Sequence, residues 1–567
     1  MTRFKAMLAL AAAAAMATGC GENEIATAHI RSVVAAASGT AAGADSAGVA
    51  TVSSSAGGTP EQPVLQLPNG DTLAVRPAVV AFYTAREYMP AWTDDDEILP
   101  RGIELLEAIG SASLEGLDPD RYHYSTAHAM ARLLEDDAVE DQELEYLGNL
   151  DLLLTESFVR LAQDLEAGTL DPTVGDRDWR IPRDTVAEEA LLEMLAAGQD
   201  PAEVLASVRP RVPYYDRTAR ALARYRQIEQ AGGWRTVPEG ETLSEGDRDP
   251  RVAALRARLS AGDDRTESRL ARAGARDATL FDERLREALG HFQDRHGLHE
   301  DGALGPNSIK ALNVPVADRI AALRLNLDRW RWLPNDLGEM FILVNVAGFE
   351  LELVEDGRAI ESMNVVVGKT ANRTPIFQDT LEHIVVNPYW NVPASIAEEE
   401  IMPIVRRDPS YLARNNYEMV REGGSYRIRQ RPGPGNALGN VKFLFPNDMN
   451  IYLHDTPADH LFTQRSRAFS HGCIRVERPD DLARTLLAAL TDHDASYYDE
   501  LRRGDGEQWV PLDRKIPVYI SYFTAWVDED GVTRFHEDIY QRDETLAPET
   551  QRKLAPVEVR PIAAALD

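Results

Sequence analysis

Cysteine is scarce in this chain, whose 567 residues include only two, Cys20 and Cys473. Such a chain has no framework of several disulfides of the kind that stabilises small exported domains. The apolar run at residues 6–16 is also short, because a helix that spans a bilayer needs about 20 apolar residues. Stability must therefore come from buried cores, and a length of 567 residues predicts several domains.

Basic residues are outnumbered by acidic ones. The chain has 60 Lys and Arg against 92 Asp and Glu, which gives a net charge of −32 at pH 7. A strongly acidic chain repels polyanions, so binding to nucleic acid or to an anionic membrane surface is excluded as its main task. The charged fraction of 27% and the hydrophobic fraction of 44% are those of an ordinary soluble globular protein.

The N-terminal segment has the features of an export signal. Two basic residues precede the apolar run, and the small residues 17–19 end directly at Cys20. This order resembles a bacterial lipoprotein signal, in which the cysteine is lipidated and becomes the new N-terminus. An ordinary secretory signal cut nearby is the alternative. Because Gly21 rather than Asp follows, we expect a periplasmic lipoprotein anchored to the outer membrane, with Cys473 as its only free thiol.

Composition and periodicity divide the remaining chain. Residues 21–62 are rich in Ala, Gly, Ser and Thr and bury too little apolar surface to offset ordering, which predicts a flexible tether. Apolar residues then recur at helical spacing to about residue 230, which predicts a scaffold without evident chemistry. The predicted boundaries are a signal at 1–19, a tether at 20–70, a helical scaffold at 71–240, a small helical module at 241–315, a mostly-β domain at 316–535 and a C-terminal tail at 536–567.

The predicted small module contains a recognisable sequence motif. Phe292–Leu298 is followed by Asp301–Pro306, between apolar residues spaced for helices. This motif resembles that of the three-helix peptidoglycan-binding module, although a polar insert at Ser260–Thr279 departs from the pattern of that module. The resemblance implies wall binding, and a packing module without sugar binding is the alternative.

β-rich runs such as Phe341–Val346 and Pro517–Tyr522 predict a sheet after residue 340. An insert at about 393–430, which we interpret as helical, leaves and rejoins this sheet. An insert of that kind beside an active site is a candidate lid.

The stretch Ser470–Val476 carries the strongest chemical signal. It places Cys473 after a histidine and a glycine, and His454 lies upstream at the end of a strand-like run. A thiol nucleophile needs a base and backbone donors for an oxyanion, and this stretch offers candidates for both. The stretch, with Gly368 and Thr374-Pro375 upstream, resembles the L,D-transpeptidase family, exported enzymes that crosslink peptidoglycan stem peptides.

The resemblance implies an α+β multidomain protein of the large branch of that family. This branch has a helical scaffold domain, a three-helix peptidoglycan-binding module and a mostly-β catalytic domain with a helical lid insert. The resemblance further implies that Cys473 is the nucleophile and that His454 is the general base and proton donor. Gly472 would supply an oxyanion N–H, whereas His471 and Ser470 would shape the turn and its hydrogen bonds.

Further residues are candidates for substrate contact. Arg475 is a candidate partner for a substrate carboxylate, and Asp455 is a candidate to orient the imidazole through its carbonyl or side chain. Tyr452, Trp390 and Asn436 complete the predicted substrate-binding set, and core packing is the alternative for Trp390. The sequence contains no recognisable zinc motif, so we expect neither a metal nor a cofactor.

Four alternatives remain open at this point. On the same fold, the thioester of Cys473 could pass to a lipoprotein lysine, or to water as in a carboxypeptidase. A structural lipoprotein that binds peptidoglycan with an inactive catalytic domain is the alternative from another class. A papain-like protease fits less well, because Cys473 lies late in the chain without the residues that surround the cysteine of that family. The sequence leaves the oligomeric state open.

Overall fold

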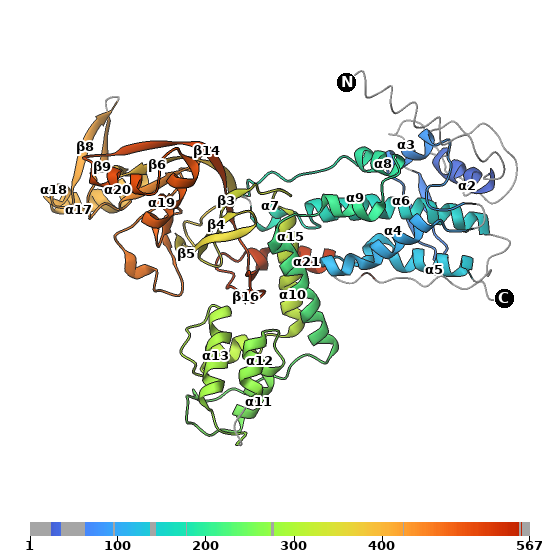
Figure 1. Cartoon of the computed structure of the whole chain (residues 1–567), viewed down its shortest axis with the longest axis horizontal. Helices are drawn as coiled ribbons and strands as arrows, with labels where there is room; N and C mark the ends of the chain where they lie inside the picture. The colour runs from blue at the N-terminus through green and yellow to red at the C-terminus, as the bar shows by residue number, and fades with distance from the viewer. Residues whose placement is uncertain are drawn as a thin grey trace. The chain divides into compact units, whose positions relative to one another are not determined.

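The structure is a computed structural model of the chain and describes residues 24–35, 63–94, 97–135, 143–176, 179–273, 277–422, 425–554 and 557. These residues divide into two compact units (Figure 1). Of the described residues, unit 1 comprises those up to Glu166 together with Thr185–Arg209 and Val557, and unit 2 comprises those within Ala167–Asp184 and Pro210–Leu554. The predicted signal, Cys20 and most of the predicted tether lie outside the described residues.

Unit 1 is built around α6 (Glu143–Ala167), whose residues 147–159 are buried throughout. Asp151 on this helix is fully buried, and its carboxylate accepts hydrogen bonds from the N–H groups of Ala91, Trp92 and Thr93 and from the hydroxyl of Tyr83. These bonds tie a loop to the central helix. The other elements of unit 1 are β1 (Val64–Gln66), β2 (Thr72–Ala74), α3 (Pro77–Ala85), α4 (Pro100–Gly110), the 3₁₀ helices η1 (Ser111–Glu115) and η2 (Pro119–Tyr122), α5 (Tyr124–Glu135), α8 (Glu188–Ala196) and α9 (Pro201–Val208).

One part of the predicted flexible tether is helical. Residues Glu24–Ala35 form α2, and Ile30 and Val34 are buried in the core of unit 1. The imidazole of His29 hydrogen-bonds to Asn149 on α6 at 2.8 Å. The tether interpretation is wrong for these residues, because their few apolar side chains recur at helical spacing and find a complementary surface.

Unit 2 contains the predicted β domain. Its main sheet has, within the described residues, nine strands in the order β12-β5-β13-β11-β10-β6-β14-β3-β4, and β4 also pairs with β5. Strand β3 is buried along its whole length, as expected for a strand covered on both faces. The strands are β3 (Met340–Asn345), β4 (Glu350–Glu355), β5 (Arg358–Gly368), β6 (Phe377–Val386), β10 (Val441–Leu444), β11 (Leu453–His454), β12 (Ala468–Ser470), β13 (Ile474–Val476) and β14 (Gln508–Ser521).

Helices cover this sheet from several parts of the chain. Helix α10 (Pro213–Gln230) packs along α15 (Val316–Arg331), and both contribute to the core of the sheet. The predicted scaffold boundary at residue 240 therefore does not coincide with the division between the units. The remaining elements are α7 (Pro172–Gly175), η4 (Asp459–Leu461), α19 (Pro479–Leu490), α20 (Ser496–Arg503), the strands β15 (Ala525–Val527) and β16 (Thr533–Phe535), and α21 (Arg542–Leu554), which lies in the predicted C-terminal tail.

The small module has its own core and one helix more than predicted. Helices α11 (Arg251–Ser260), α13 (Glu283–Arg295) and α14 (Pro306–Leu312) enclose buried Leu255, Leu289 and Phe292, and α12 (Arg265–Arg272) lies within the predicted polar insert. The amide of Gln293 binds both sides of the Asp301–Gly302 turn, at 2.8 Å each. These two hydrogen bonds explain why the recognisable sequence motif includes a glutamine followed by an Asp-Gly pair.

The insert is helical only in its first half. It begins with α16 (Ala394–Ile396), the π-helical turn η3 (Ala397–Ile401), α17 (Met402–Arg407) and α18 (Tyr411–Arg414). Strands β8 (Tyr417–Glu422) and β9 (Ser425–Gln430) then form a small sheet with β7 (Trp390–Asn391). The interpretation of the whole insert as helical is wrong, because residues 425–430 alternate in polarity as a strand does.

Candidate active site

Cys473 lies on the tight turn that joins β12 to β13. The hydroxyl of Ser470 donates to the carbonyl of Cys473 at 2.5 Å and accepts the N–H of Gly472 at 3.0 Å. From the neighbouring loop, Thr374 donates to the carbonyl of Gly472 at 2.8 Å. Gly472 has φ +119°, a conformation that side chains rarely adopt, so a residue without Cβ is required at this turn.

The thiol of Cys473 is half-buried and protonated at rest. Its Sγ donates to the carbonyl of Asn450 at 3.5 Å. Burial raises the pKa of Cys473 to about 11, although Tyr452 and Arg475 act in the opposite direction. Because only the thiolate is a strong nucleophile, this cysteine needs a base that removes its proton.

His454 has the tautomer that such a base requires. Its Nδ1 lies 2.6 Å from the carbonyl oxygen of Asp455, and because a carbonyl only accepts, Nδ1 carries the hydrogen. The Nε2 atom of a neutral imidazole is then free to accept a proton. Burial and the nearby charges of Arg475 and Lys442 lower the pKa of His454 to about 3, so the ring is neutral at pH 7.

Two cations flank this imidazole on adjacent strands. His454 on β11 is paired with Lys442 on β10 and with Arg475 on β13, so the three side chains form a row across the sheet. Lys442 is 8% exposed and reaches Glu507 at 3.6 Å, whereas the Nε of Arg475 is buried without a hydrogen-bond partner. Such a row favours an anionic ligand, because buried cations require compensation.

A cavity of about 680 Å³ brings these groups together, a size suited to a peptide-sized ligand. The thiol and the imidazole both line it, but among the described residues the thiol donates to the carbonyl of Asn450 rather than to His454. Catalytic hydrogen bonds are often long before substrate binds. The predicted residues that line the cavity are Trp390, Tyr452, His454, Ser470, His471, Cys473 and Arg475.

The insert forms one side of this cavity. Pro393, Ser395, Ile396 and Glu400 line it. The carboxylate of Glu400 lies 2.8 Å from Nε2 of His471, the residue two positions before Cys473. The candidate lid is thus joined to the catalytic turn in this structure.

Two predicted substrate contacts lie elsewhere. The carboxylate of Asp455 accepts the N–H groups of Asn440 and Thr456, at 2.6 Å each, and only its main-chain carbonyl reaches the imidazole. Asn436 is 1% exposed and binds the carbonyls of Pro388 and Arg431. Neither side chain lines the cavity, because both are used to hold the loops around it.

The N–H of Gly472, which the sequence analysis assigns to an oxyanion, is bonded to Ser470 in this structure. Lys442 and Glu400 were not predicted as site residues. A lysine within the apolar run Val441–Leu444 was a usable signal, because a strand with both faces covered rarely holds a charge without a function. Glu400 gave no such signal, because it lies in a run of three glutamates.

Two negative findings concern the described residues only. Within those ranges, no group of three or more His, Cys, Asp and Glu side chains is placed to hold a metal ion. No helix in the same ranges combines the length and the apolarity that crossing a bilayer requires.

Comparison with known families identifies two regions of the chain. A family model for a scaffold domain matches residues 77–222, and a model for an L,D-transpeptidase catalytic domain matches residues 339–520. The curated Haemophilus influenzae protein "Putative L,D-transpeptidase" is 34% identical over 240 residues, which cover 39% of this chain and 48% of that protein. The chain thus spans about half the length of this relative.

Solved structures of L,D-transpeptidases are also similar to this chain. An enzyme from Mycobacterium smegmatis shares 16% identity with a TM-score of 0.18, over 32% of this chain and 58% of that one. A Xylanimonas cellulosilytica L,D-transpeptidase shares 15% identity with a TM-score of 0.15, over 50% of this chain and 98% of that one.

Residues 339–520, which contain the thiol, the imidazole and the flanking cations, are therefore an L,D-transpeptidase catalytic domain, and residues 77–222 are a scaffold domain. The predicted family is confirmed, and so is the predicted α+β multidomain class with a helical N-terminal region and a mostly-β C-terminal domain.

Proposed function

We propose that this protein crosslinks peptidoglycan stem peptides, diaminopimelate to diaminopimelate, through a thioester on Cys473. One observation carries the proposal: a protonated thiol shares a cavity with a neutral imidazole whose Nδ1–H is held by the Asp455 carbonyl. That arrangement suits proton transfer from sulfur to Nε2 of His454 at the moment of attack.

The reaction has two acyl transfers. The sulfur of Cys473 attacks the carbonyl that links diaminopimelate to a terminal D-alanine, while His454 takes the thiol proton. The tetrahedral intermediate collapses to a thioester, and His454 gives the proton to the departing amine of D-alanine. The side-chain amine of a second diaminopimelate then attacks the thioester, His454 accepts its proton, and the thiol is restored.

The oxyanion requires donors in place before the reaction. We assign this role to the N–H of Cys473 and to the hydroxyl of Tyr452, a residue that lines the same cavity as the thiol. The N–H of Gly472 contributes only after its bond to Ser470 is released.

Lys442 and Arg475 would hold carboxylates of the stem peptide. Diaminopimelate carries carboxylates at both ends, and the partnerless Nε of Arg475 is a ready donor. In this scheme the cations that lower the pKa of His454 also orient the substrate.

We further propose that the protein acts in the periplasm, anchored to the outer membrane through a lipid on Cys20. The basis is the signal-like N-terminus that ends at this cysteine. Cells fed labelled palmitate should label the protein, and Cys20→Ser should abolish the label. Secretion of unlabelled protein would instead favour an ordinary cleaved signal.

The activity is tested with disaccharide-tetrapeptides that contain diaminopimelate. Mass spectrometry should find crosslinked dimers with the protein and none with Cys473→Ala. If tripeptides are the only products, the enzyme is a carboxypeptidase and the crosslinking proposal fails. A carbapenem should add its mass to Cys473, and the absence of this adduct on folded protein would favour the inactive binding protein.

A further inference from the structure

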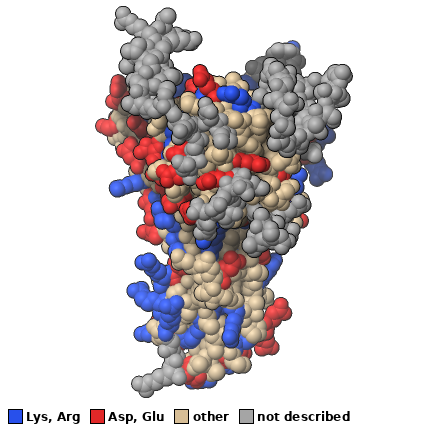
Figure 2. Space-filling model, turned by 90° about the vertical axis from the view of Figure 1, so that its right-hand side faces the viewer, with Lys and Arg blue, Asp and Glu red and all other residues tan. Residues whose placement is uncertain are grey.

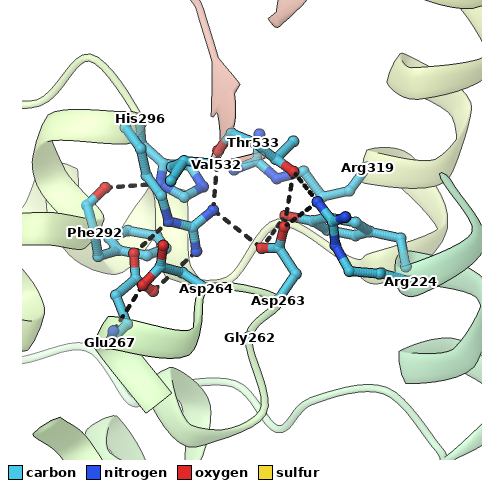
Figure 3. Close-up of polar contacts among 12 residues, drawn as sticks. Arg224, Gly262, Asp263, Asp264, Glu267, Phe292, His296, Arg319, Val532 and Thr533 are labelled. Carbon is cyan, nitrogen blue, oxygen red and sulfur yellow. Dashed lines mark hydrogen bonds and ion pairs between the residues drawn. The ribbon is translucent and has the colours of Figure 1, made fainter. Parts of the chain in front are cut away.

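The four-helix module (α11–α14) is held against the catalytic domain by a buried ion cluster. Arg295 is 3% exposed and binds Glu267 at 2.9 Å and Asp263 at 3.3 Å. It also donates to the carbonyl of Thr533 on β16 at 3.3 Å, and the hydroxyl of Thr533 donates to Asp263 at 2.8 Å. Figure 3 shows Asp263 between Thr533 and Arg224. A buried charge with several partners fixes the geometry of this contact.

Aromatic contacts extend the same junction. Phe535 of β16 stacks with His296 at a ring separation of 5.7 Å, and the guanidinium of Arg319 on α15 lies 4.3 Å from the Phe535 ring centre. His296 lies above the ion cluster in Figure 3. Three separate parts of unit 2, the module, α15 and β16, thus meet around one aromatic ring.

A cavity of about 560 Å³ opens where these parts meet, and it is separate from the cavity of Cys473. The module contributes Lys310, α15 contributes Arg319, and the loop before β12 contributes Arg465. Glu537 is the single acidic residue among those that line it. Leu298, Val314 and Phe535 supply an apolar wall.

The cations of this cavity are only partly compensated by neighbouring groups, since the guanidinium of Arg319 donates to the carbonyl of Ala311. Lys310 and Arg465 are exposed, and no ion pair is found for either in the described chain. The Nε of Arg319 is buried without a hydrogen-bond partner, and so is Nε2 of His536. The whole chain has a net charge of −32, whereas residues 249–313 contain 11 basic and 11 acidic residues and are neutral. Figure 2 shows Lys and Arg side chains in blue together with Asp and Glu side chains in red on the face that it draws.

His296 of the module adds a hydrogen-bond acceptor to the cationic and apolar groups of the cavity. Nδ1 of His296 lies 2.7 Å from the carbonyl of Phe292, so it carries the hydrogen and leaves Nε2 as an acceptor on a residue that lines the cavity. Burial and the neighbouring Arg295 lower the pKa of His296, which keeps the ring neutral. Beside its cations, the cavity therefore offers the imidazole of His296 as a neutral acceptor and an apolar wall.

We propose that this cavity is an accessory site for the carboxylate-bearing stem peptide of a peptidoglycan strand, distinct from the catalytic cavity. A stem peptide has carboxylates for Lys310, Arg319 and Arg465, amide N–H groups for His296, and methyl groups for the apolar wall. An uncharged glycan makes no use of the three cations. The choice of ligand rests on the proposed function.

The position of this cavity relative to the catalytic turn indicates what binding there would do for the reaction. Arg465 and Ser466 lie on the loop that runs into β12, and β12 leads to the catalytic turn. A stem held here ties its strand to the enzyme, so that other stems of the same strand are presented to Cys473 at a high effective concentration. The gain applies to polymeric peptidoglycan and not to single soluble stems.

The test is charge reversal at the two exposed cations in the full-length protein. Lys310→Glu with Arg465→Glu should weaken cosedimentation with intact peptidoglycan about tenfold in Kd. The matched control is Arg220→Glu with Arg235→Glu, two exposed arginines outside the cavity, which should keep wild-type binding. Glycan strands stripped of their peptides by an amidase keep a lactyl carboxylate on each muramic acid but lack the stem, so they should bind about as weakly as the cavity variant binds intact strands. Lys310→Gln with Arg465→Gln serves if the reversed variant does not fold.

Two outcomes would overturn the site: equal binding by the cavity variant and the control, or equal binding of stripped and intact strands. Turnover of a soluble disaccharide-tetrapeptide separates this inference from the proposed function. The cavity variant should match the wild type with that substrate while its KM for polymeric peptidoglycan rises. If the wild type has no turnover at all, the transpeptidase proposal fails, and the sedimentation result still decides whether the cavity binds stems.

Discussion

At the scale of single residues, the site pairs a neutral thiol with a neutral imidazole. Burial works against both charged forms, raising the pKa of Cys473 and lowering that of His454. The cations Lys442 and Arg475 act in the same direction on the imidazole. This differs from a preformed thiolate–imidazolium pair, because here the proton moves only when the substrate carbonyl is attacked.

The pH dependence of acylation follows from these pKa values. We expect kcat/KM to be constant between about 3, where His454 becomes protonated and stops acting as a base, and about 11, where the thiol ionises. Lys442→Met removes a nearby positive charge, which makes the imidazolium less unfavourable and moves the acidic limb to higher pH. Stopped-flow acylation measures this profile, and an acidic limb of the wild type near 6.5, the ordinary histidine value, would contradict it.

Asp455 provides a second prediction at this scale. Because its main-chain carbonyl and not its carboxylate holds the imidazole, Asp455→Asn should retain kcat/KM within about threefold, whereas His454→Ala should lower it by about 10²–10⁴. Steady-state rates on disaccharide-tetrapeptide decide the question. A loss with Asp455→Asn as large as with His454→Ala would show that the carboxylate itself acts on the ring.

At the scale of elements, the insert behaves as a small folding unit. Val392, Ile401 and Ile428 form its own core, with residues of β7 and of the insert helices packed around them. A contact between the Glu400 carboxylate and Nε2 of His471, at 2.8 Å, connects this unit to the catalytic turn. Both partners are partly exposed, and exposed pairs contribute about 0–1 kcal/mol.

Glu400→Gln should therefore loosen the insert without unfolding it. We expect faster hydrogen exchange in residues 394–407 and an unchanged Tm, because the core of the insert stays intact. Arg407→Gln, on the same insert but outside the cavity, is the matched control and should leave exchange unaltered. Identical exchange in both variants would mean that the pair does not restrain the lid.

At the scale of the whole molecule, the contact between the four-helix module and β16 depends on Arg295. The side chains of Asp263 and Glu267 are 2% and 0% exposed; Glu267 depends on this arginine for compensation, and Asp263 shares it with Arg224. A module fixed in this way makes a composite cavity possible, since its walls come from parts far apart in sequence.

Arg295→Met should destabilise the protein by about 3–5 kcal/mol, because it leaves buried Glu267 without its ion-pair partner and removes one of the partners of Asp263. Arg295→Met combined with Glu267→Met removes most of the uncompensated charge and should recover much of that loss. Urea unfolding followed by tryptophan fluorescence measures both variants, with Trp234 near the junction as a reporter. Equal stability of the single variant and the wild type would show that the cluster does not support the junction.

The sequence by itself determined the nucleophile candidate, the base candidate and the family, because the Ser470–Cys473 stretch and the β-rich runs are local signals. The motif around Gln293 was also visible in the sequence, because its hydrogen-bond partners Asp301 and Gly302 lie close by along the chain. Only the tertiary structure decided which groups surround the thiol. Lys442 joins His454 and Arg475 through strand register, and the Asp455 side chain turns away from the cavity toward a neighbouring loop. Pairing between distant strands and the packing of separate helices set these contacts, and neither is encoded in the spacing of residues along the chain.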